Sequence, residues 1–455
     1  MLLDFNREGT VTYGIVVVVA LLLVLPGASA GEVVSVREAI DLALAKNHLL
    51  RAATAEQDAA AAQVAVSRSR YFPNLTFELG AVYSDSPTQV FMMKLNQGRF
   101  TQSDFLLDNL NHPSPYGDFR TAVGLVQPLY DSSISRGQAV AEREQAERSF
   151  ARERQRQEVA FTVYRACLEV QRARFRQEVA EQALAGAREH LRLAEVREEA
   201  GTGLTSDALR ARTFLAEMEE QRITATHDGR LARLRLGRAV GGPPGMEVDL
   251  AGYVAPLPVT QSTEEVLQQA LRSRPELREV TASREKGDAA VRLAKGAYLP
   301  TVYGTALYEM HDRNYPFGND NDAWLVGVAL RWELFAGLRS KAELERARAL
   351  QRVASEQEEQ LRAEIPLQVE EAWLRRQEAE QRREVARHAQ RDAEETVRLI
   401  SRRFDNSLAT LVDLLDAQTA LNRTRLRLVD NESDLAQATA RLYLAAGTFL
   451  QEVAQ

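Results

Sequence analysis

The segment Leu408-Ala409-Thr410-Leu411-Val412-Asp413-Leu414-Leu415-Asp416-Ala417-Gln418 decides the fold, because it follows one long helical pattern and opens another. Upstream of it, residues 339–405 are rich in Ala, Arg, Glu, Leu and Gln and contain no Gly. Their one proline, Pro366, should kink or loosen the helix. A helix of this length extends over ~100 Å, which no single globular core requires. The segment is therefore predicted to be the turn of a very long helical hairpin.

The chain carries this plan twice. A second turn, Gly201-Thr202-Gly203-Leu204-Thr205-Ser206-Asp207, aligns with the first so that Gly201 matches Ser407 and Asp207 matches Asp413. Each turn opens a seam of apolar residues at coiled-coil spacing, which predicts knobs-into-holes packing between helices. The seams are Leu204, Ala208, Ala211, Leu215 and Met218 in the first copy, and Leu414, Leu421, Leu428, Leu435, Leu442 and Phe449 in the second.

The sequence pattern of each copy predicts the same order of helices and strands. The expected elements are a short helix (about 35–46; 263–273), a medium helix (48–70; 275–297), two strands (74–84 and 120–130; 300–310 and 323–335), a long helix (133–200; 339–405) and a second medium helix (206–239; 410–446). The predicted domains are a first repeat over 31–240, a linker over 241–261 and a second repeat over 262–455. The linker begins Gly241-Gly242-Pro243-Pro244-Gly245 and cannot be helical. The first copy has a longer loop, inside 84–120.

The predicted strands alternate between apolar and small or polar residues. In the fourth strand Trp324, Val326, Val328, Leu330, Trp332 and Leu334 share one face. Strands of roughly ten residues with one apolar face fit a lipid-facing barrel wall, although a half-buried sheet in a soluble domain shows the same alternation. The two tryptophans near opposite ends of this strand fit interfacial anchors. Four strands cannot close a barrel alone, so the barrel interpretation requires oligomerisation.

The N-terminus and the charge balance indicate an exported protein that does not bind nucleic acid. The apolar run Ile15–Leu25 is too short to span a bilayer, and Ala28-Ser29-Ala30 follows it as a cleavage site. We therefore expect a signal peptide over residues 1–30, with no lipid on the mature N-terminus because no Cys follows the cleavage site. The net charge of −7 excludes general electrostatic binding to nucleic acid.

Several motifs in this order resemble the TolC-like outer membrane efflux protein family over the whole mature chain. They are Val36-Arg37-Glu38-Ala39-Ile40-Asp41-Leu42-Ala43-Leu44, Tyr71-Phe72-Pro73, Tyr298-Leu299-Pro300, Gln127-Pro128-Leu129-Tyr130-Asp131 and the two turns. The resemblance implies a mainly helical protein with a small strand part. Three copies would form one outer-membrane barrel of twelve strands, in contact with outer-membrane lipid, and a periplasmic tunnel of twelve helices. The homotrimer would be the exit duct of an efflux or type I secretion system in a Gram-negative-type cell. Its partners would be a periplasmic adaptor and an inner-membrane transporter of unknown class.

The resemblance also implies the site residues. Asp413 and Asp416 correspond to aspartates that line the family's periplasmic constriction, and threefold symmetry would stack them as carboxylate rings that favour cations. The alternative is that Asp413 only caps the first turn of the last helix. The turns that would contact the adaptor are Gly201, Thr202, Gly203, Leu204, Ser407, Leu408, Ala409 and Thr410. Because Ser407 stands where the family usually has Gly, the neighbouring Asn406 is a candidate to supply the left-handed conformation.

The sequence predicts no enzyme, cofactor or metal site. Its six histidines are scattered, no phosphate-binding loop follows a strand, and Met92-Met93 lack His or Cys partners. Two rival functions remain. A structural coiled-coil tether explains the seams but not the duplicated strands, and a periplasmic adaptor should show one helical hairpin rather than two.

Overall fold

The computed structural model describes residues 32–453. The expected signal peptide over residues 1–30, and with it the unlipidated N-terminus, lies outside the described residues. The fold is mainly helical with a small strand part, as predicted. None of the helices between residues 32 and 453 combines the length and the apolarity needed to cross a membrane.

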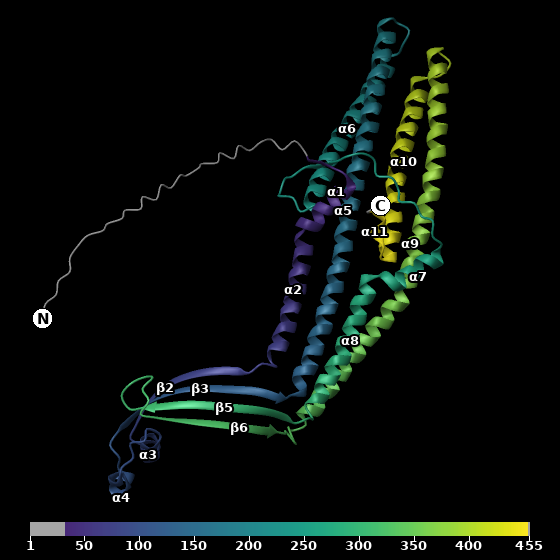
Figure 1. The fold of residues 1–455 in the computed structure, drawn as a ribbon. Coiled ribbons are helices and arrows are strands. Elements are labelled where there is room, and N and C mark those ends of the chain that lie inside the picture. The colour runs from purple at the N-terminus through teal and green to yellow at the C-terminus, as the bar shows by residue number, and fades with distance from the viewer. Residues whose placement is uncertain (1–31, 454–455) are drawn as a thin grey trace, which may run out of the picture.

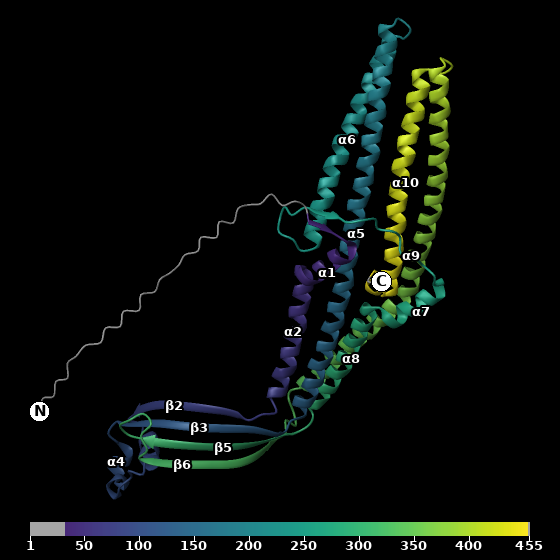
Figure 2. The same cartoon turned by 45° about the horizontal axis from the view of Figure 1, so that its top comes forward.

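Two very long helices, α5 (Ser132–Glu199) and α9 (Arg339–Asp405), run from the sheet to the turns at the far end of the molecule (Figure 1). Shorter helices pack against them: α6 (Thr205–Ala239) and α10 (Leu411–Ala446) towards the turns, and α2 (His48–Ser69) and α8 (Pro275–Gly296) towards the sheet. From edge to edge the order is α6-α5-α10-α9 near the turns and α2-α5-α8-α9 near the sheet. Figures 1 and 2 show the resulting pair of hairpins side by side.

The predicted seam of the last helix is buried at every position except Leu428, which is partly buried. Leu414, Leu421, Leu435 and Leu442 are at most 4% exposed, and Phe449, in the short helix α11 (Phe449–Val453), is fully buried. Helix α9 continues through Pro366, whose side chain is exposed. A proline facing solvent removes one hydrogen bond without opening the packed side of the helix.

A belt of short elements lies against the helices at mid-length, and most of it packs with them in the largest hydrophobic cluster. It consists of β1 (Glu32–Val34), α1 (Val36–Lys46), the linker with β4 (Val248–Leu250), and α7 (Thr263–Ser273). The linker is not helical, as predicted, but the parallel pairing of β4 with β1 was not anticipated. Gln171 fixes the linker to α5 by accepting from Val254 N at 2.6 Å and donating to Val254 O at 3.2 Å.

Four antiparallel strands form one sheet that leaves the helices at a steep angle in both views (Figures 1 and 2). They are β2 (Asn74–Ser84), β3 (Tyr116–Tyr130), β5 (Thr301–Asp312) and β6 (Asn321–Arg331), in the order β2-β3-β5-β6. The predicted fourth strand was too long: Trp332 and Leu334 lie beyond Arg331, which pairs with Thr301, the first residue of β5. Pro300, just before it, lacks the amide proton that would continue the pairing.

The long loop of the first copy is more ordered than the sequence indicated. It contains α3 (Pro87–Asn96), a 3₁₀ turn (Gln102–Phe105) and α4 (Leu107–Asn111), and β3 begins at Tyr116 rather than near residue 120. These helices are too short for the periodicity of apolar residues to reveal them.

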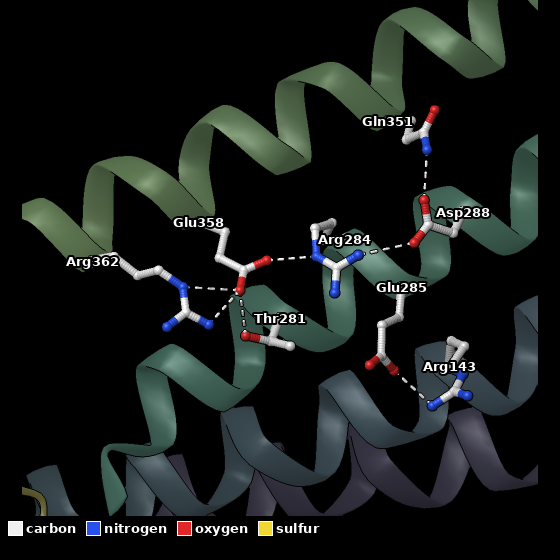
Figure 3. A network of polar contacts seen from close by, with 8 residues as sticks. All are labelled: Arg143, Thr281, Arg284, Glu285, Asp288, Gln351, Glu358 and Arg362. Carbon is white, nitrogen blue, oxygen red and sulfur yellow. Dashed lines mark hydrogen bonds and ion pairs between the residues drawn. The ribbon is translucent and has the colours of Figure 1, made fainter. Parts of the chain in front are cut away.

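Polar contacts join α8 to α9 between the belt and the sheet (Figure 3). Glu358 of α9 is only 5% exposed and accepts hydrogen bonds from Arg284 Nε at 2.6 Å, Arg362 Nη2 at 2.7 Å and Thr281 Oγ1 at 3.0 Å. Burial raises the pKa of Glu358, but the hydrogen bonds from Arg362, Arg284 and Thr281 outweigh it and keep the pKa below its usual range.

Candidate functional site: helix turns and channel wall

The first turn is built around a left-handed glycine. Gly201 has φ +71°, and the turn closes through Gly201 N to Glu198 O at 2.9 Å and Thr202 N to Arg197 O at 2.9 Å. This pattern satisfies the last carbonyls of a helix and suits glycine, which has no Cβ. Gly203 is needed for a different reason, because a Cβ there would lie 2.9 Å from the Arg197 Cβ atom.

The second turn repeats this geometry with a serine. Ser407 has φ +58°, its amide donates to Phe404 O at 3.0 Å, and Leu408 N donates to Arg403 O at 2.7 Å. The expectation that Asn406 supplies the left-handed residue is wrong, because Asn406 has φ −90° and instead donates from Nδ2 to Arg402 O at 2.7 Å. The hydrogen bonds that close the turn therefore determine that Ser407, and not Asn406, adopts the left-handed conformation.

The two turns contact each other. Arg197 lies over the ring of Phe404, with 4.1 Å between its guanidinium carbon and the ring centroid. Beneath this contact lies a buried cluster from both hairpins, made of Ala194, Ala208, Ala211, Phe404, Leu411 and Leu414. Of the predicted turn residues, Leu204 and Leu408 remain 67% and 69% exposed, so each turn presents an apolar side chain to solvent.

Asp413 takes part in a capping box. Its carboxylate accepts from Thr410 N at 2.9 Å and from Thr410 Oγ1 at 2.7 Å, while Asp413 N donates back to Thr410 Oγ1 at 3.2 Å. The hydrogen bonds from the Thr410 hydroxyl and amide lower the pKa of Asp413. The capping role considered from the sequence is therefore present, and Asp413 and Asp416 are both exposed on the protomer.

The strand register gathers the apolar residues of all four strands on one face. One row across the sheet joins Phe77, Val123, Tyr308 and Trp324, and the next joins Leu75, Leu125, Ala306 and Val326. Many of these side chains are open to solvent in the protomer, with Trp324 76% exposed and Val326 69%. An apolar face of this extent is typical of a surface that is covered in the functional state.

The opposite face of the sheet, here named the polar face, carries mostly small and polar residues, with Val82, Val126, Leu307 and Leu325 as apolar exceptions. Arg120 of β3 lies between Glu78 of β2, at 3.6 Å, and Glu309 of β5, at 2.9 Å. The two faces therefore differ in the way expected of a wall between lipid and water.

The outer edges of the helical layer also carry exposed apolar stripes. On α9 six apolar residues lie on one heptad frame, at separations of 3, 14, 7, 11 and 14 residues, with polar residues at the frame positions between them. They are Leu350, Val353, Leu367, Leu374, Val385 and Leu399, all at least 48% exposed. The opposite edge exposes Leu49 and Val66 of α2 and Leu209 and Ile223 of α6. These stripes were not predicted, although isolated apolar residues at this spacing in a charged helix are the sequence signal that indicates them.

A family model described as outer membrane efflux protein matches residues 39–242 and 266–448. The chain belongs to the outer membrane efflux protein family. Among curated relatives of this efflux protein, the proteases secretion protein PrtF of Dickeya chrysanthemi is 26% identical over 73% of this chain and 70% of the relative. The outer membrane efflux protein BepC of Brucella suis biovar 1 (strain 1330) is also 26% identical, over 73% of this chain and 74% of the relative.

Solved channel structures share the fold of this efflux protein. CusC superposes with a TM-score of 0.77 at 18% identity, covering 91% of this chain and 92% of that one. The Campylobacter jejuni outer membrane channel CmeC gives 0.76 at 16% identity, covering 91% and 85%, and the open state of Neisseria gonorrhoeae MtrE gives 0.74 at 18%, covering 91% and 89%.

These findings support an outer-membrane exit duct that extends into the periplasm, as predicted. The family and its solved neighbours are channels rather than enzymes. Among residues 32–453, no three His, Cys, Asp or Glu side chains are grouped so that they could hold a metal ion.

Proposed function

We propose that three copies of this efflux protein close into one continuous duct for an efflux or type I secretion system. The observation that carries the proposal is that both edges of the protomer are open. In the described part of the chain, the edge strands of the sheet have unpaired outer sides, and the edge helices expose apolar side chains. A repeated heterologous contact that closes on itself satisfies both edges at once.

In the sheet, the outer edges of β2 and β6 have no partner strand within residues 32–453. Along the chain β2 runs away from the helices and β6 runs back towards them, so β6 of one copy can pair antiparallel with β2 of the next. Unpaired backbone groups are not tolerated in lipid, and closure removes them. Four strands from each copy give a wall of twelve, with the rows containing Phe77 and Trp324 facing lipid.

In the helical part, the α9 stripe of one copy would pack on α2 and α6 of the next. The two edges have the lengths to match, because α2 and α6 follow each other along the side of the layer opposite α9 (Figure 1). The seam at Leu367 and Leu374 is the middle of this contact. Twelve helices would then enclose the periplasmic tunnel.

We place the constriction at Asp413 and Asp416 and the contact with a periplasmic adaptor at the two turns. Both aspartates are exposed and lie three residues apart near the start of α10, so three copies can stack two carboxylate rings. The exposed side chains of Leu204 and Leu408 would provide an apolar contact surface for the adaptor. An inner-membrane transporter would supply the cargo, and the mature N-terminus would carry no lipid.

The test is the mass and the conductance of detergent-purified protein. Light scattering should give the mass of a trimer, and the trimer should insert into a planar bilayer and pass small cation-selective currents. Leu367→Glu combined with Leu374→Glu should yield monomers, whereas Leu231→Glu, an exposed leucine of α6 that is off the stripes, should remain trimeric. A wild-type protein that is monomeric and does not insert would rule out the duct.

A further inference from the structure

The segment between β2 and β3, residues 85–115, is a small folded unit with its own core, here named the outer unit. Val90 and Met93 of α3 are buried against Tyr116. The rings of Phe91, Phe100 and Phe105 meet edge to face, with centroids 4.7 and 4.9 Å apart. A segment with buried side chains and packed rings holds its shape better than a solvated loop.

An ion pair completes this packing. Lys94 Nζ lies 2.6 Å from Asp104 Oδ1, and Asp104 also accepts from Thr101 N at 2.8 Å. The hydrogen bonds from Lys94 and Thr101 lower the pKa of Asp104 to about 2. The pair therefore stays charged over the pH range that cells experience.

A buried polar network fastens the outer unit to the end of the sheet. Gln97 is 1% exposed, and its Nε2 donates to Asp118 Oδ1 at 2.8 Å while its Oε1 accepts from Tyr116 Oη at 2.9 Å. The other oxygen of Asp118 lies 2.8 Å from His311 Nδ1 of β5. Arg99 adds an ion pair to Asp320, in the β5–β6 loop, at 2.7 Å.

The register shows on which face of the sheet this fastening lies. His311 pairs directly with Arg120, and Asp118, two residues before Arg120, points to the same side. That side is the polar face, opposite the apolar rows that include Phe77. In the proposed duct the polar face lines the lumen, so the outer unit is attached on the lumen side of the outer mouth. Figures 1 and 2 place α3 and α4 at the outer end of the sheet.

The outer unit exposes three consecutive apolar side chains. Phe105, Leu106 and Leu107 are 65%, 60% and 75% exposed, and we refer to them as the ridge. Apart from the contact of Phe105 with the Phe100 ring, these side chains are largely open to solvent in the protomer. A rigid apolar ridge of this kind marks a contact surface.

We propose that the ridges of the three protomers meet across the outer mouth and close it with an apolar constriction. This inference rests on the proposed trimer. The occupant is a second copy of the chain, because the outer unit follows β2, the strand at the protomer edge, and is held on the lumen side. Threefold symmetry then brings three ridges towards a common axis. A narrow apolar ring excludes water and ions until a cargo pushes it apart.

Cysteine cross-linking tests the contact directly, because the only native cysteine does not interfere. Cys167 is buried, and burial raises the pKa of its thiol to about 12, so it is unreactive. Leu107→Cys in the intact protein should form disulfide-linked dimers under mild oxidation. The control is Tyr315→Cys, which is 69% exposed in the β5–β6 loop, next to Phe317 that stacks on Phe77 of the lipid face. It should form none.

Single-channel current tests the function of the ridge. The variant Phe105→Ser/Leu106→Ser/Leu107→Ser should pass a several-fold larger current than the wild type, and Tyr315→Ser should not change it. If wild-type trimers insert but the triple variant passes the same current and Leu107→Cys gives no dimers, the constriction is overturned and the duct remains. If the wild type neither trimerises nor inserts, the duct and the constriction both fail.

Discussion

The guanidinium group of Arg197 lies 4.1 Å from the ring centroid of Phe404, and this contact joins the turn of the first hairpin to the turn of the second. The two residues belong to different copies of the internal repeat, and each lies in the last turn of its long helix. Because the contact is made within one protomer, it holds the pair of hairpins together at the end where the tunnel would have to widen.

Removing this contact should loosen the tunnel end. A cation over an aromatic ring contributes about 0.5–1 kcal/mol at an exposed site, so Arg197→Ala should make openings longer or more frequent in single-channel recordings. The matched control is Arg192→Ala, because among the described residues Arg192 forms an ion pair only with Glu189 of its own helix, at 2.6 Å. Equal recordings from the two variants would show that the Arg197–Phe404 contact does not restrain the turns.

Two variants separate the two roles of Asp413. The variant Asp413→Ala/Asp416→Ala removes six carboxylates from a trimer and should lower cation selectivity. Thr410→Ala removes the hydroxyl that caps α10 but keeps both charges. It should lower the thermal midpoint and leave selectivity unchanged. If Thr410→Ala changes selectivity as much as the double variant does, the effect comes from the cap and not from a carboxylate ring.

The cap should resist moderate acid. The pKa of Asp413 is lowered in the folded chain, so its contribution to stability is present above the unfolded pKa of about 3.9 and is lost only as the pH falls through the lower folded value. The thermal midpoint of the wild type minus that of Thr410→Ala should therefore be constant from pH 8 to pH 5. A difference that already shrinks near pH 6 would contradict this assignment.

Ser407→Gly should stabilise the protein. A non-glycine residue in the left-handed region costs about 1 kcal/mol, and Ser407 makes no side-chain hydrogen bond that the change would lose among the described contacts. The control Asn406→Gly replaces a residue with negative φ whose side chain bonds Arg402 O, so it should destabilise. Thermal unfolding of both variants beside the wild type measures the two shifts, which should have opposite signs.

Glu358→Ala should destabilise the junction between α8 and α9 by about 2 kcal/mol per protomer, because Arg284 and Thr281 lose a buried acceptor. Glu359→Ala, one residue further on an exposed face, should cost little. Because the pKa of Glu358 is lowered, its contribution is present above the unfolded pKa of about 4.3 and is lost only as the pH falls through the lower folded pKa. Denaturation at pH 7 should therefore separate the two variants, and the separation should shrink only when the pH is lowered below about 4.

Periodic patterns predicted most of this fold, and local geometry supplied the rest. The seam from Leu414 to Phe449 could be identified because heptad spacing and burial have the same cause. The pairing of β1 with β4 joins segments far apart in the chain, and three-residue strands leave no periodicity to detect. The choice between Asn406 and Ser407 depended on which amide closes the turn, a property of backbone geometry that residue preference does not determine.

The candidate site was also predicted only in part. The family resemblance located Asp413, Asp416 and the turns, whereas the Thr410–Asp413 cap was considered only as an alternative. The contact between Arg197 and Phe404, and the network around Gln97, combine residues that no spacing rule connects. Such contacts depend on how the helices and strands pack in three dimensions.

The belt holds each hairpin at mid-length, so each hairpin can tilt about that level. Gln171 and Val254 fix the linker to α5, and the Tyr443 hydroxyl donates to Pro258 O, so the linker is tied to both long hairpins at one level. From Gln171 to the end of α5 at Glu199 the helix extends for about 42 Å. A tilt of about 10° at the belt therefore moves the turn by about 7 Å, given the helical rise per residue. In the proposed trimer, a small rotation at the level of the belt would therefore widen the tunnel end without unwinding any helix.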